Sequence, residues 1–282
     1  MIRQLTIVGL GFLGGSVAKA ARSRRVADTI VAVGRDARRL DAARREGVVD
    51  TVASDIGAGV RGADLVLLSA PVAAIQALLP AVAEHAPADA VVTDVGSAKA
   101  AIARTADRLA GERPLAFVGS HPMAGSEQSG YAVSRADLFE RAIVIVTPTA
   151  RTPAAATERV RSFWEALGAR VIPLAPDLHD EVVAAISHLP HLVAYALVDS
   201  VTRLNGSALD LAARGFKDTT RIAASDPRVW REIFETNRAA LAATVAAFRA
   251  ALADLEDLVA GGDGEALERK LAQIKAVRER LR

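Results

Sequence analysis

A glycine-rich loop near the start of the chain constrains the fold more than any other sequence feature. The stretch "LTIVGLGFLGGS" runs from an apolar segment into one with helical spacing, and Gly9, Gly11 and Gly14 stand in the G-x-G-x-x-G pattern. The first glycine permits a tight turn, the second lets the backbone approach a pyrophosphate, and the third lets helix and strand pack closely. Phe12 and Leu13 complete the loop. We expect it to bind a dinucleotide at the helix N-terminus, and a ligand-free glycine turn is the alternative.

Short apolar runs alternate with alanine-rich helical stretches over the first 174 residues. Continuous apolar strands separated by helices indicate a parallel sheet covered on both faces, so we predict an α/β Rossmann-type domain over 1–174 with a mostly parallel sheet. Strand-like runs stop after about Pro176. An all-α domain is therefore expected over 175–282. The predicted strands are 5–10, 29–34, 63–70, 90–95, 115–120, 142–148 and 169–174.

The last two predicted helices, about 226–260 and 264–281, are joined by "GGDG", a turn that lets them pack antiparallel. The longer one carries a broad apolar stripe with many alanines beside it. Small residues permit close approach of helices, so this stripe predicts a homodimer through the C-terminal helices. An ordinary face of an intrachain bundle is the alternative. The stripe consists of Ile233, Phe234, Leu241, Val245, Phe248, Leu252, Leu255 and Leu258.

Composition limits the partners and the location. The chain has 35 Lys and Arg against 33 Asp and Glu, which does not favour nucleic acid as a partner. With no cysteine, disulfides and thiol chemistry are excluded. The N-terminus begins with a strand and lacks signal-peptide features. The apolar window 65–83 contains Pro71 and Pro80 and is interpreted as a strand, a turn and a short helix, so we expect a soluble, cytoplasmic protein without a membrane segment.

The residues after the second predicted strand bear on the choice of dinucleotide. Asp36 follows Gly14 by 22 residues, close to where an acid usually receives the adenosine ribose hydroxyls, and this favours NAD. Arg35, Arg38 and Arg39 lie beside it, and guanidinium groups there could bind the 2′-phosphate of NADP. A solvated helix face is the other explanation of these arginines and is favoured slightly, so NAD is the predicted cofactor and NADP stays open.

Two stretches that follow predicted strands carry candidates for catalysis. Ser97 lies in "TDVGSAK" and His121 in "VGSHPMAGSE". A histidine with a near-neutral pKa suits removal of a proton from an alcohol as hydride leaves its carbon, although a loop histidine is more often a turn residue. In the helical half, His188 and His191 come without a third ligand, so no metal site is predicted.

A further cationic cluster lies in "GFKDTTRIAASDPRVW". Lys217 and Arg221 could clamp a carboxylate, or they could take part in ion pairs at a helix start. Asp226 and Pro227 look like an N-cap followed by a first-turn proline.

The motifs together resemble the prephenate dehydrogenase family, including its arogenate and cyclohexadienyl relatives. "GLGFLGGS", "DVGSAK", "GSHPMAGSE", "SHLPH" and "GFKDTTRIAASDPRVW" carry the resemblance, which runs from Ile2 to at least Phe234. It implies a dinucleotide-binding N-terminal domain and a helical dimerisation domain. It also implies oxidative decarboxylation of prephenate to 4-hydroxyphenylpyruvate with reduction of NAD, in tyrosine biosynthesis.

The resemblance assigns roles by motif position. His121 would take the proton of the ring hydroxyl, and Ser97 would contact the same hydroxyl or orient the histidine. His191 and Arg221 would hold the carboxylate-bearing ends of the substrate, with Glu127 and Lys217 nearby. His188 and Trp230 match positions that we assign to packing.

Several alternatives to this reading stay open. Arogenate differs from prephenate only by an amino group in place of a keto group, and the motifs do not separate the two substrates. A non-catalytic NAD(P)-binding regulator and a β-hydroxyacid dehydrogenase are further hypotheses, but "GFKD" is a poor match to the catalytic lysine of the latter. We expect neither a chorismate mutase segment before the loop nor a regulatory domain after Leu281, and tyrosine is therefore expected to inhibit, if at all, by competing with substrate.

Overall fold

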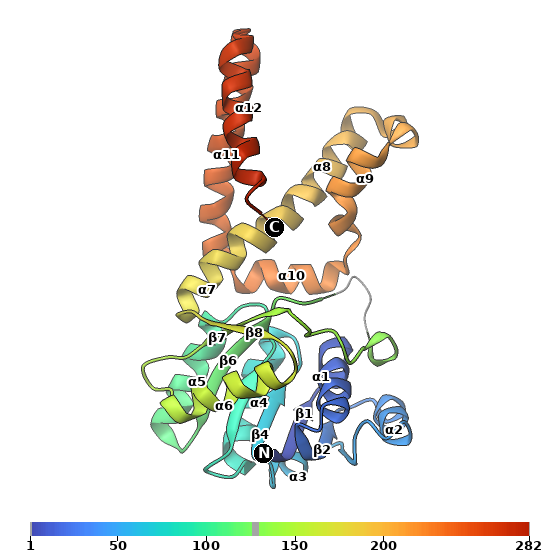
Figure 1. Ribbon diagram of the computed structural model, residues 1–282, viewed down its shortest axis with the longest axis vertical. Helices are drawn as coiled ribbons and strands as arrows, with labels where there is room; N and C mark the ends of the chain where they lie inside the picture. The colour runs from blue at the N-terminus through green and yellow to red at the C-terminus, as the bar shows by residue number, and fades with distance from the viewer. Residues whose placement is uncertain (1, 126–129, 282) are drawn as a thin grey trace.

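The computed structural model describes residues 2–125 and 130–281, and its N-terminal part is built on one eight-stranded sheet (Figure 1). The strand order is β3-β2-β1-β4-β5-β6-β7-β8, and every pair is parallel except β6 with β7. The prediction of a mostly parallel Rossmann-type sheet is confirmed. The strands are β1 (Ile2–Val8), β2 (Ala27–Val33), β3 (Thr51–Ala53), β4 (Leu65–Leu68), β5 (Val91–Asp94), β6 (Ala116–Pro122), β7 (Ile143–Thr147) and β8 (Arg170–Pro173).

The edge strand β3 is missing from the sequence-based prediction. It has only three residues, and they are exposed or half-buried, so no apolar run marks the strand. It forms because Thr51 to Ala53 pair in parallel register with the end of β2.

Helices cover both faces of the sheet, as predicted. On one face, α1 (Phe12–Ser23), α2 (Ala37–Arg45) and α6 (Ala154–Ala166) contribute to a core that includes Val17, Leu40 and Trp164. On the other face, α3 (Ile56–Val60), α4 (Val72–His85) and α5 (Ala100–Glu112) pack around Leu79 and Ile102. The apolar window 65–83 is β4 followed by α4, as its prolines indicate.

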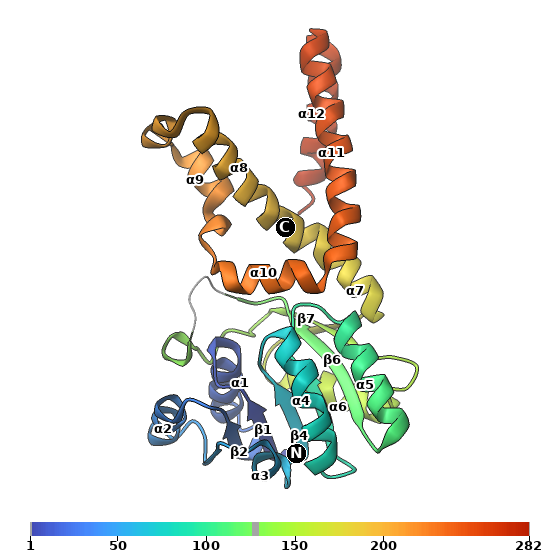
Figure 2. The same ribbon diagram turned by 180° about the vertical axis from the view of Figure 1, so that it is seen from behind.

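Beyond Pro173 the described chain is helical, in agreement with the prediction. Figure 1 and Figure 2 show α10 lying across the carboxyl-terminal edge of the sheet, while α8 and the α11–α12 hairpin project away from it. The second part thus covers the edge where the strands end. Its elements are α7 (Pro176–Val183), the π-helical turn η2 (Ala184–His188), α8 (Leu189–Asn205), η3 (Gly206–Leu211), α9 (Arg214–Thr220), η4 (Arg221–Ala224), α10 (Pro227–Thr236), α11 (Arg238–Gly261) and α12 (Gly264–Arg278).

The predicted helix 226–260 is wrong, because the structure has two helices there. Asp226 caps α10 and accepts a hydrogen bond from the Arg228 amide, as expected for an N-cap before Pro227. The break comes at Asn237, whose backbone leaves the helical region (φ −116°, ψ 33°). The side-chain amide of Asn237 donates to the Asp180 carbonyl oxygen at 2.7 Å, so a long-range contact accompanies the change of direction.

The helical run from Pro176 to Leu211 contains an 18-residue window with a mean hydropathy of 1.5, which is long and apolar enough to cross a membrane by length and composition. The expectation of no membrane segment was based on the apolar window 65–83 and did not include this run. Its beginning is buried in the protein, since His179, Asp180 and His188 are all less than one-tenth exposed. Its end is apolar and uncovered, with Leu204 and Leu211 each 86% exposed.

Candidate active site

The glycine loop between β1 and α1 has the geometry that the pattern requires. Gly9 has φ +98°, and a Cβ atom there would lie 2.1 Å from the Ser69 carbonyl oxygen. A Cβ atom on Gly14 would lie 2.0 Å from the Gly9 oxygen, so both positions exclude a side chain. Around Gly11, in contrast, no atom from beyond the adjoining backbone lies within 4 Å of the Cβ position. Gly11 therefore keeps open space beside the N-terminus of α1, where a phosphate can approach.

A cleft of about 680 Å³ lies at the carboxyl ends of β1, β2 and β4, where the strand order reverses. This is the usual ligand site of open α/β sheets. Gly9 and Gly11 line it together with Arg35, Asp36 and Arg39. Asp36 also caps α2 by accepting a hydrogen bond from the Arg39 amide at 3.1 Å, and its side chain stays half exposed. Phe12, Leu13 and Gly14 form the first turn of α1.

The contrast between Gly9 and Gly11 leads to a testable prediction. Gly11→Ala is expected to leave the thermal midpoint nearly unchanged but to weaken dinucleotide binding at least tenfold, on the order of 1.4 kcal/mol, because a methyl group would fill the approach to the phosphates. Gly9→Ala is expected to lower the midpoint, because it forces the Ser69 carbonyl to move and places alanine at a positive φ. Calorimetry with NAD and thermal unfolding measure the two effects. Unchanged NAD affinity in Gly11→Ala would contradict the assignment.

Ser97 lies just after β5, and His121 lies near the end of the adjacent parallel strand β6, at the edge that carries the dinucleotide cleft. Ser97 is half-buried in the loop after β5. His121 is the penultimate residue of β6 and is also half-buried. The structure thus brings these two predicted residues to one edge of the sheet.

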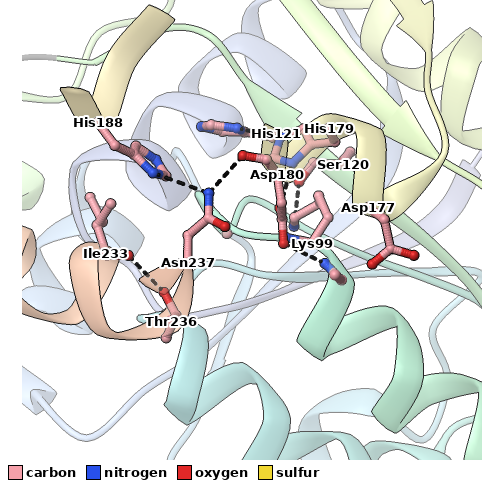
Figure 3. A network of polar contacts seen from close by, with 12 residues as sticks. Lys99, Ser120, His121, Asp177, His179, Asp180, His188, Ile233, Thr236 and Asn237 are labelled. Carbon is pink, nitrogen blue, oxygen red and sulfur yellow. Dashed lines mark hydrogen bonds and ion pairs between the residues drawn. The ribbon is translucent and has the colours of Figure 1, made fainter. Parts of the chain in front are cut away.

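His121 is the outer member of a chain of three side chains (Figure 3). Its Nδ1 lies 2.9 Å from Nε2 of His179, and Nδ1 of His179 lies 2.8 Å from Oδ1 of Asp180. His179 and Asp180 belong to α7, so the chain joins the sheet to the helical part. Neither residue was predicted to lie in the site.

Backbone amides hold the Asp180 carboxylate in place. The amide of Lys99 donates to Oδ1 at 2.7 Å, and the amide of Ala100 donates to Oδ2 at 3.0 Å. On the other side, the Asn237 amide group that binds the Asp180 carbonyl also lies 3.2 Å from Nδ1 of His188. Asp180 therefore connects α5, α7 and α11 at one buried point.

A buried ion pair lies beneath this network. The ammonium group of Lys99 contacts the Asp94 carboxylate and donates to the Ser120 carbonyl oxygen at 3.0 Å, and both side chains of the pair are fully buried. Asp94 also accepts hydrogen bonds from the amides of Gly96 at 2.8 Å and Ser120 at 3.0 Å. The pair joins the loop that carries Ser97 to the end of β6, which carries His121.

Burial dominates the protonation of the histidines. It lowers the pKa of His121 well below the ordinary value, and the neighbouring His179, Lys99 and His188 add to the lowering. It also lowers the pKa of His179 and, to about 4, the pKa of His188. Burial works to raise the pKa of Asp180, but the hydrogen bonds from His179 and the two backbone amides keep it below its ordinary value. At neutral pH the chain therefore consists of two neutral imidazoles and one carboxylate.

The residues assigned to the substrate's ends lie on the helical part. The His191 ring stacks on Trp230 with centroids 3.5 Å apart, and its Nδ1 lies 2.9 Å from the Ser187 carbonyl oxygen. Burial lowers the pKa of His191, the Ser187 contact opposes this, and the Arg221 guanidinium nearby adds to the lowering. Arg221 and Lys217 are exposed, one turn apart. Glu127 lies outside the described residues.

Comparisons with known proteins decide the family. One family profile, described as the nucleotide-binding domain of prephenate dehydrogenase, matches residues 17–173. A second, described as the dimerization domain of prephenate dehydrogenase, matches residues 175–273. The chain belongs to the prephenate dehydrogenase family. Membership confirms the resemblance seen in the motifs and the expectation of an NAD(P)-dependent dehydrogenase.

Individual members of the prephenate dehydrogenase family support the same conclusion. The cyclohexadienyl dehydrogenase of Zymomonas mobilis is 36% identical over 95% of this chain and 92% of that protein. The prephenate dehydrogenase of Bacillus subtilis is 36% identical over 83% of this chain, which spans 64% of that protein's length. The solved structure of A. aeolicus prephenate dehydrogenase with hydroxyphenyl propionate and NAD⁺ is 34% identical, with a TM-score of 0.93 over 100% of this chain and 99% of that one.

For the hypothesis of a β-hydroxyacid dehydrogenase, the comparison shows only that the folds are similar. A 3-hydroxyisobutyrate dehydrogenase from Salmonella typhimurium superposes with a TM-score of 0.62 over 88% of each chain at 14% identity. The dinucleotide domain followed by helices is thus shared with that class of enzymes.

Proposed function

We propose that this protein oxidises and decarboxylates prephenate to 4-hydroxyphenylpyruvate with reduction of NAD, in tyrosine biosynthesis. The observation that carries the proposal is the position of His121. It stands at the carboxyl-terminal edge of the sheet that bears the dinucleotide cleft, and its Nδ1 is engaged by His179, which leaves Nε2 for a substrate hydroxyl. The A. aeolicus relative solved with NAD⁺ and hydroxyphenyl propionate supports the choice of ligands.

The chain's part in the reaction is proton transfer and alignment. NAD, when bound, accepts the hydride from the ring carbon that bears the hydroxyl group. His121 takes the hydroxyl proton as that carbon becomes a carbonyl carbon. Loss of carbon dioxide then makes the ring aromatic, and because the phenol product keeps one hydrogen on this oxygen, the same imidazole returns the proton. A neutral imidazole with a low pKa suits both steps, since it accepts a proton only transiently.

The residues around the cleft support NAD as the cofactor. We propose that Gly9 to Gly14 receive the pyrophosphate and that Asp36 receives the adenosine ribose hydroxyls. Arg35 and Arg39 line the same cleft, and they are the groups that would bind the 2′-phosphate of NADP. The Arg39 guanidinium lies 3.5 Å from the Asp36 carboxylate, so part of its charge is already compensated.

The two carboxylates of prephenate require cationic or donor groups at two ends of the pocket. We assign His191 and Arg221 to them, Lys217 and Glu127 as further substrate-binding residues, and Ser97 to the ring hydroxyl. Stacking on Trp230 holds the His191 ring in one orientation, which supports a binding role. Arogenate is the second candidate substrate, because one of the similar relatives is a cyclohexadienyl dehydrogenase and another solved relative is the Synechocystis arogenate dehydrogenase, 31% identical with a TM-score of 0.87.

We also propose a cytoplasmic homodimer with a dinucleotide domain over 1–174 and a dimerisation domain over 175–282. Leu204, Leu211 and Val259 on the projecting helices are between 65% and 86% exposed, which a second copy would cover. Such a partner also accounts for the apolar character of the run Pro176–Leu211.

An activity assay with prephenate or arogenate, each with NAD or NADP, tests the proposed function. The absorbance of the reduced nicotinamide follows the reaction. Reduction with prephenate and NAD is expected. Activity only with arogenate or only with NADP would reassign the specificity, and folded protein that is silent in every combination would refute the proposal.

Arg221→Ala is expected to raise KM for prephenate at least tenfold and to change kcat by less than about threefold, because a carboxylate clamp stabilises the bound substrate and the transition state alike. Steady-state kinetics measure both constants. Arg269→Ala removes an exposed arginine from α12, with its own ion pair to Glu265, and serves as the matched control. An unchanged KM in Arg221→Ala would contradict the clamp.

A further inference from the structure

We propose that His179 and Asp180 form a positioning dyad that determines which ring nitrogen of His121 carries a hydrogen, so that Nε2 of His121 is the free base. This inference rests on the proposed function, because it assigns the supporting machinery of the same reaction. It starts from the two contacts that link the three side chains, 2.9 Å from His121 to His179 and 2.8 Å from His179 to Asp180 (Figure 3).

The direction of the hydrogen bonds follows from Asp180. An ionised carboxylate only accepts hydrogen bonds, so Nδ1 of His179 must be the donor to Asp180. In a neutral imidazole the other nitrogen is then unprotonated, and Nε2 of His179 accepts. Nδ1 of His121 must therefore donate to it, and Nε2 of His121 is left with its lone pair. The logic is that of a catalytic triad with one additional ring between carboxylate and base.

The dyad is held rigidly enough to impose this state. The His179 side chain is fully buried, and its ring meets the ring of His121 edge to face with centroids 5.1 Å apart. The Asp180 carboxylate is fixed by the amides of Lys99 and Ala100, so it cannot turn away from His179. A site held in this way keeps the base oriented before substrate arrives.

The arrangement also links the two parts of the molecule. His121 belongs to the sheet, whereas the dyad arrives with α7, and Asn237 at the α10–α11 break fastens the Asp180 carbonyl. The base is therefore set only when α7 lies against β6 and α5. The charged and titratable groups around the dyad are Lys99, Asp94 and His188.

Kinetics of two His179 variants provide the first test. His179→Leu removes the acceptor and is expected to lower kcat for prephenate on the order of 10²-fold, with KM within about twofold, because the wrong tautomer of His121 is then populated. His179→Gln offers a carbonyl oxygen near the position of Nε2 and is expected to recover at least tenfold of that loss. His85→Gln, on α4 with its own contact to the Ala81 carbonyl, is the matched control and should keep the wild-type kcat.

Nitrogen NMR of the apo protein provides a readout that does not depend on activity or on the folding of variants. The chain has five histidines, and His121 in the wild type is expected to show a protonated Nδ1 and an unprotonated Nε2 at neutral pH. A protonated Nε2 on His121, or an unchanged kcat in folded His179→Leu, would overturn the dyad. If the wild type reduces neither NAD nor NADP, the proposed function fails, and the NMR result still decides the tautomer.

Discussion

Replacing His121 with asparagine is expected to lower kcat by roughly 10²–10⁴-fold, the usual contribution of a positioned general base, while KM for prephenate changes by less than about threefold. The imidazole is used mainly in the transition state, when the hydroxyl proton leaves. Ser120, the neighbouring polar residue of β6, is fully buried with its hydroxyl bonded to the Asp94 carbonyl oxygen, so it cannot replace the imidazole. Steady-state kinetics with prephenate and NAD measure both constants.

The control for this variant is His85→Asn, which makes the same change in another half-buried histidine on α4. It should keep the wild-type kcat. NAD binding by His121→Asn should also be unchanged, because the dinucleotide cleft is lined by other strand ends. Near-normal turnover in His121→Asn would remove this residue from the mechanism.

Lys99→Met is expected to cost the largest amount of stability, roughly 3–5 kcal/mol, because it leaves the Asp94 carboxylate buried without its counter-ion. The amides of Gly96 and Ser120 still bind the carboxylate but carry no full charge. Thermal and denaturant unfolding measure the loss. Activity should fall with it, because the Asp94–Lys99 pair joins the loop of Ser97 to the end of β6, which carries His121.

The double variant with Asp94→Asn and Lys99→Met separates burial of an unpaired charge from loss of packing. It is expected to be more stable than Lys99→Met alone, since no isolated charge remains in the core. Arg161→Met breaks the exposed pair with Glu158 instead and should leave the midpoint nearly unchanged. Equal midpoints for Lys99→Met and Arg161→Met would contradict a structural role of the buried pair.

Short-range patterns account for most of the fold that could be predicted. Seven of the strands can be recognised in the sequence as apolar runs. The strand β3 cannot, because it is short and exposed or half-buried, and it forms by pairing with β2. The uninterrupted helix predicted over 226–260 shows the same limit. The apolar periodicity continues through Asn237, but the chain turns there, where the asparagine side chain binds Asp180 from another helix.

Local patterns in the sequence suffice to predict the dinucleotide loop, the covered parallel sheet and the family. The glycine spacing and the apolar periodicity are local consequences of backbone geometry, and several motifs in fixed order make the family resemblance specific. The apolar runs also predict that His121, Ser97 and Asp36 lie at or just beyond strand ends, as they do in the structure.

The residues that surround the base, in contrast, come together only through long-range packing. His179 stands 58 residues from His121 in the chain, and "LHD" at the start of a helix carries no pattern that points to a partner. The Lys99–Asp94 pair likewise shows no sign of burial in the sequence. Such contacts depend on how α7 and the strand ends pack together. Hydrogen bonds between side chains that are distant in the chain produce no regular spacing in the sequence, so periodicity cannot predict them.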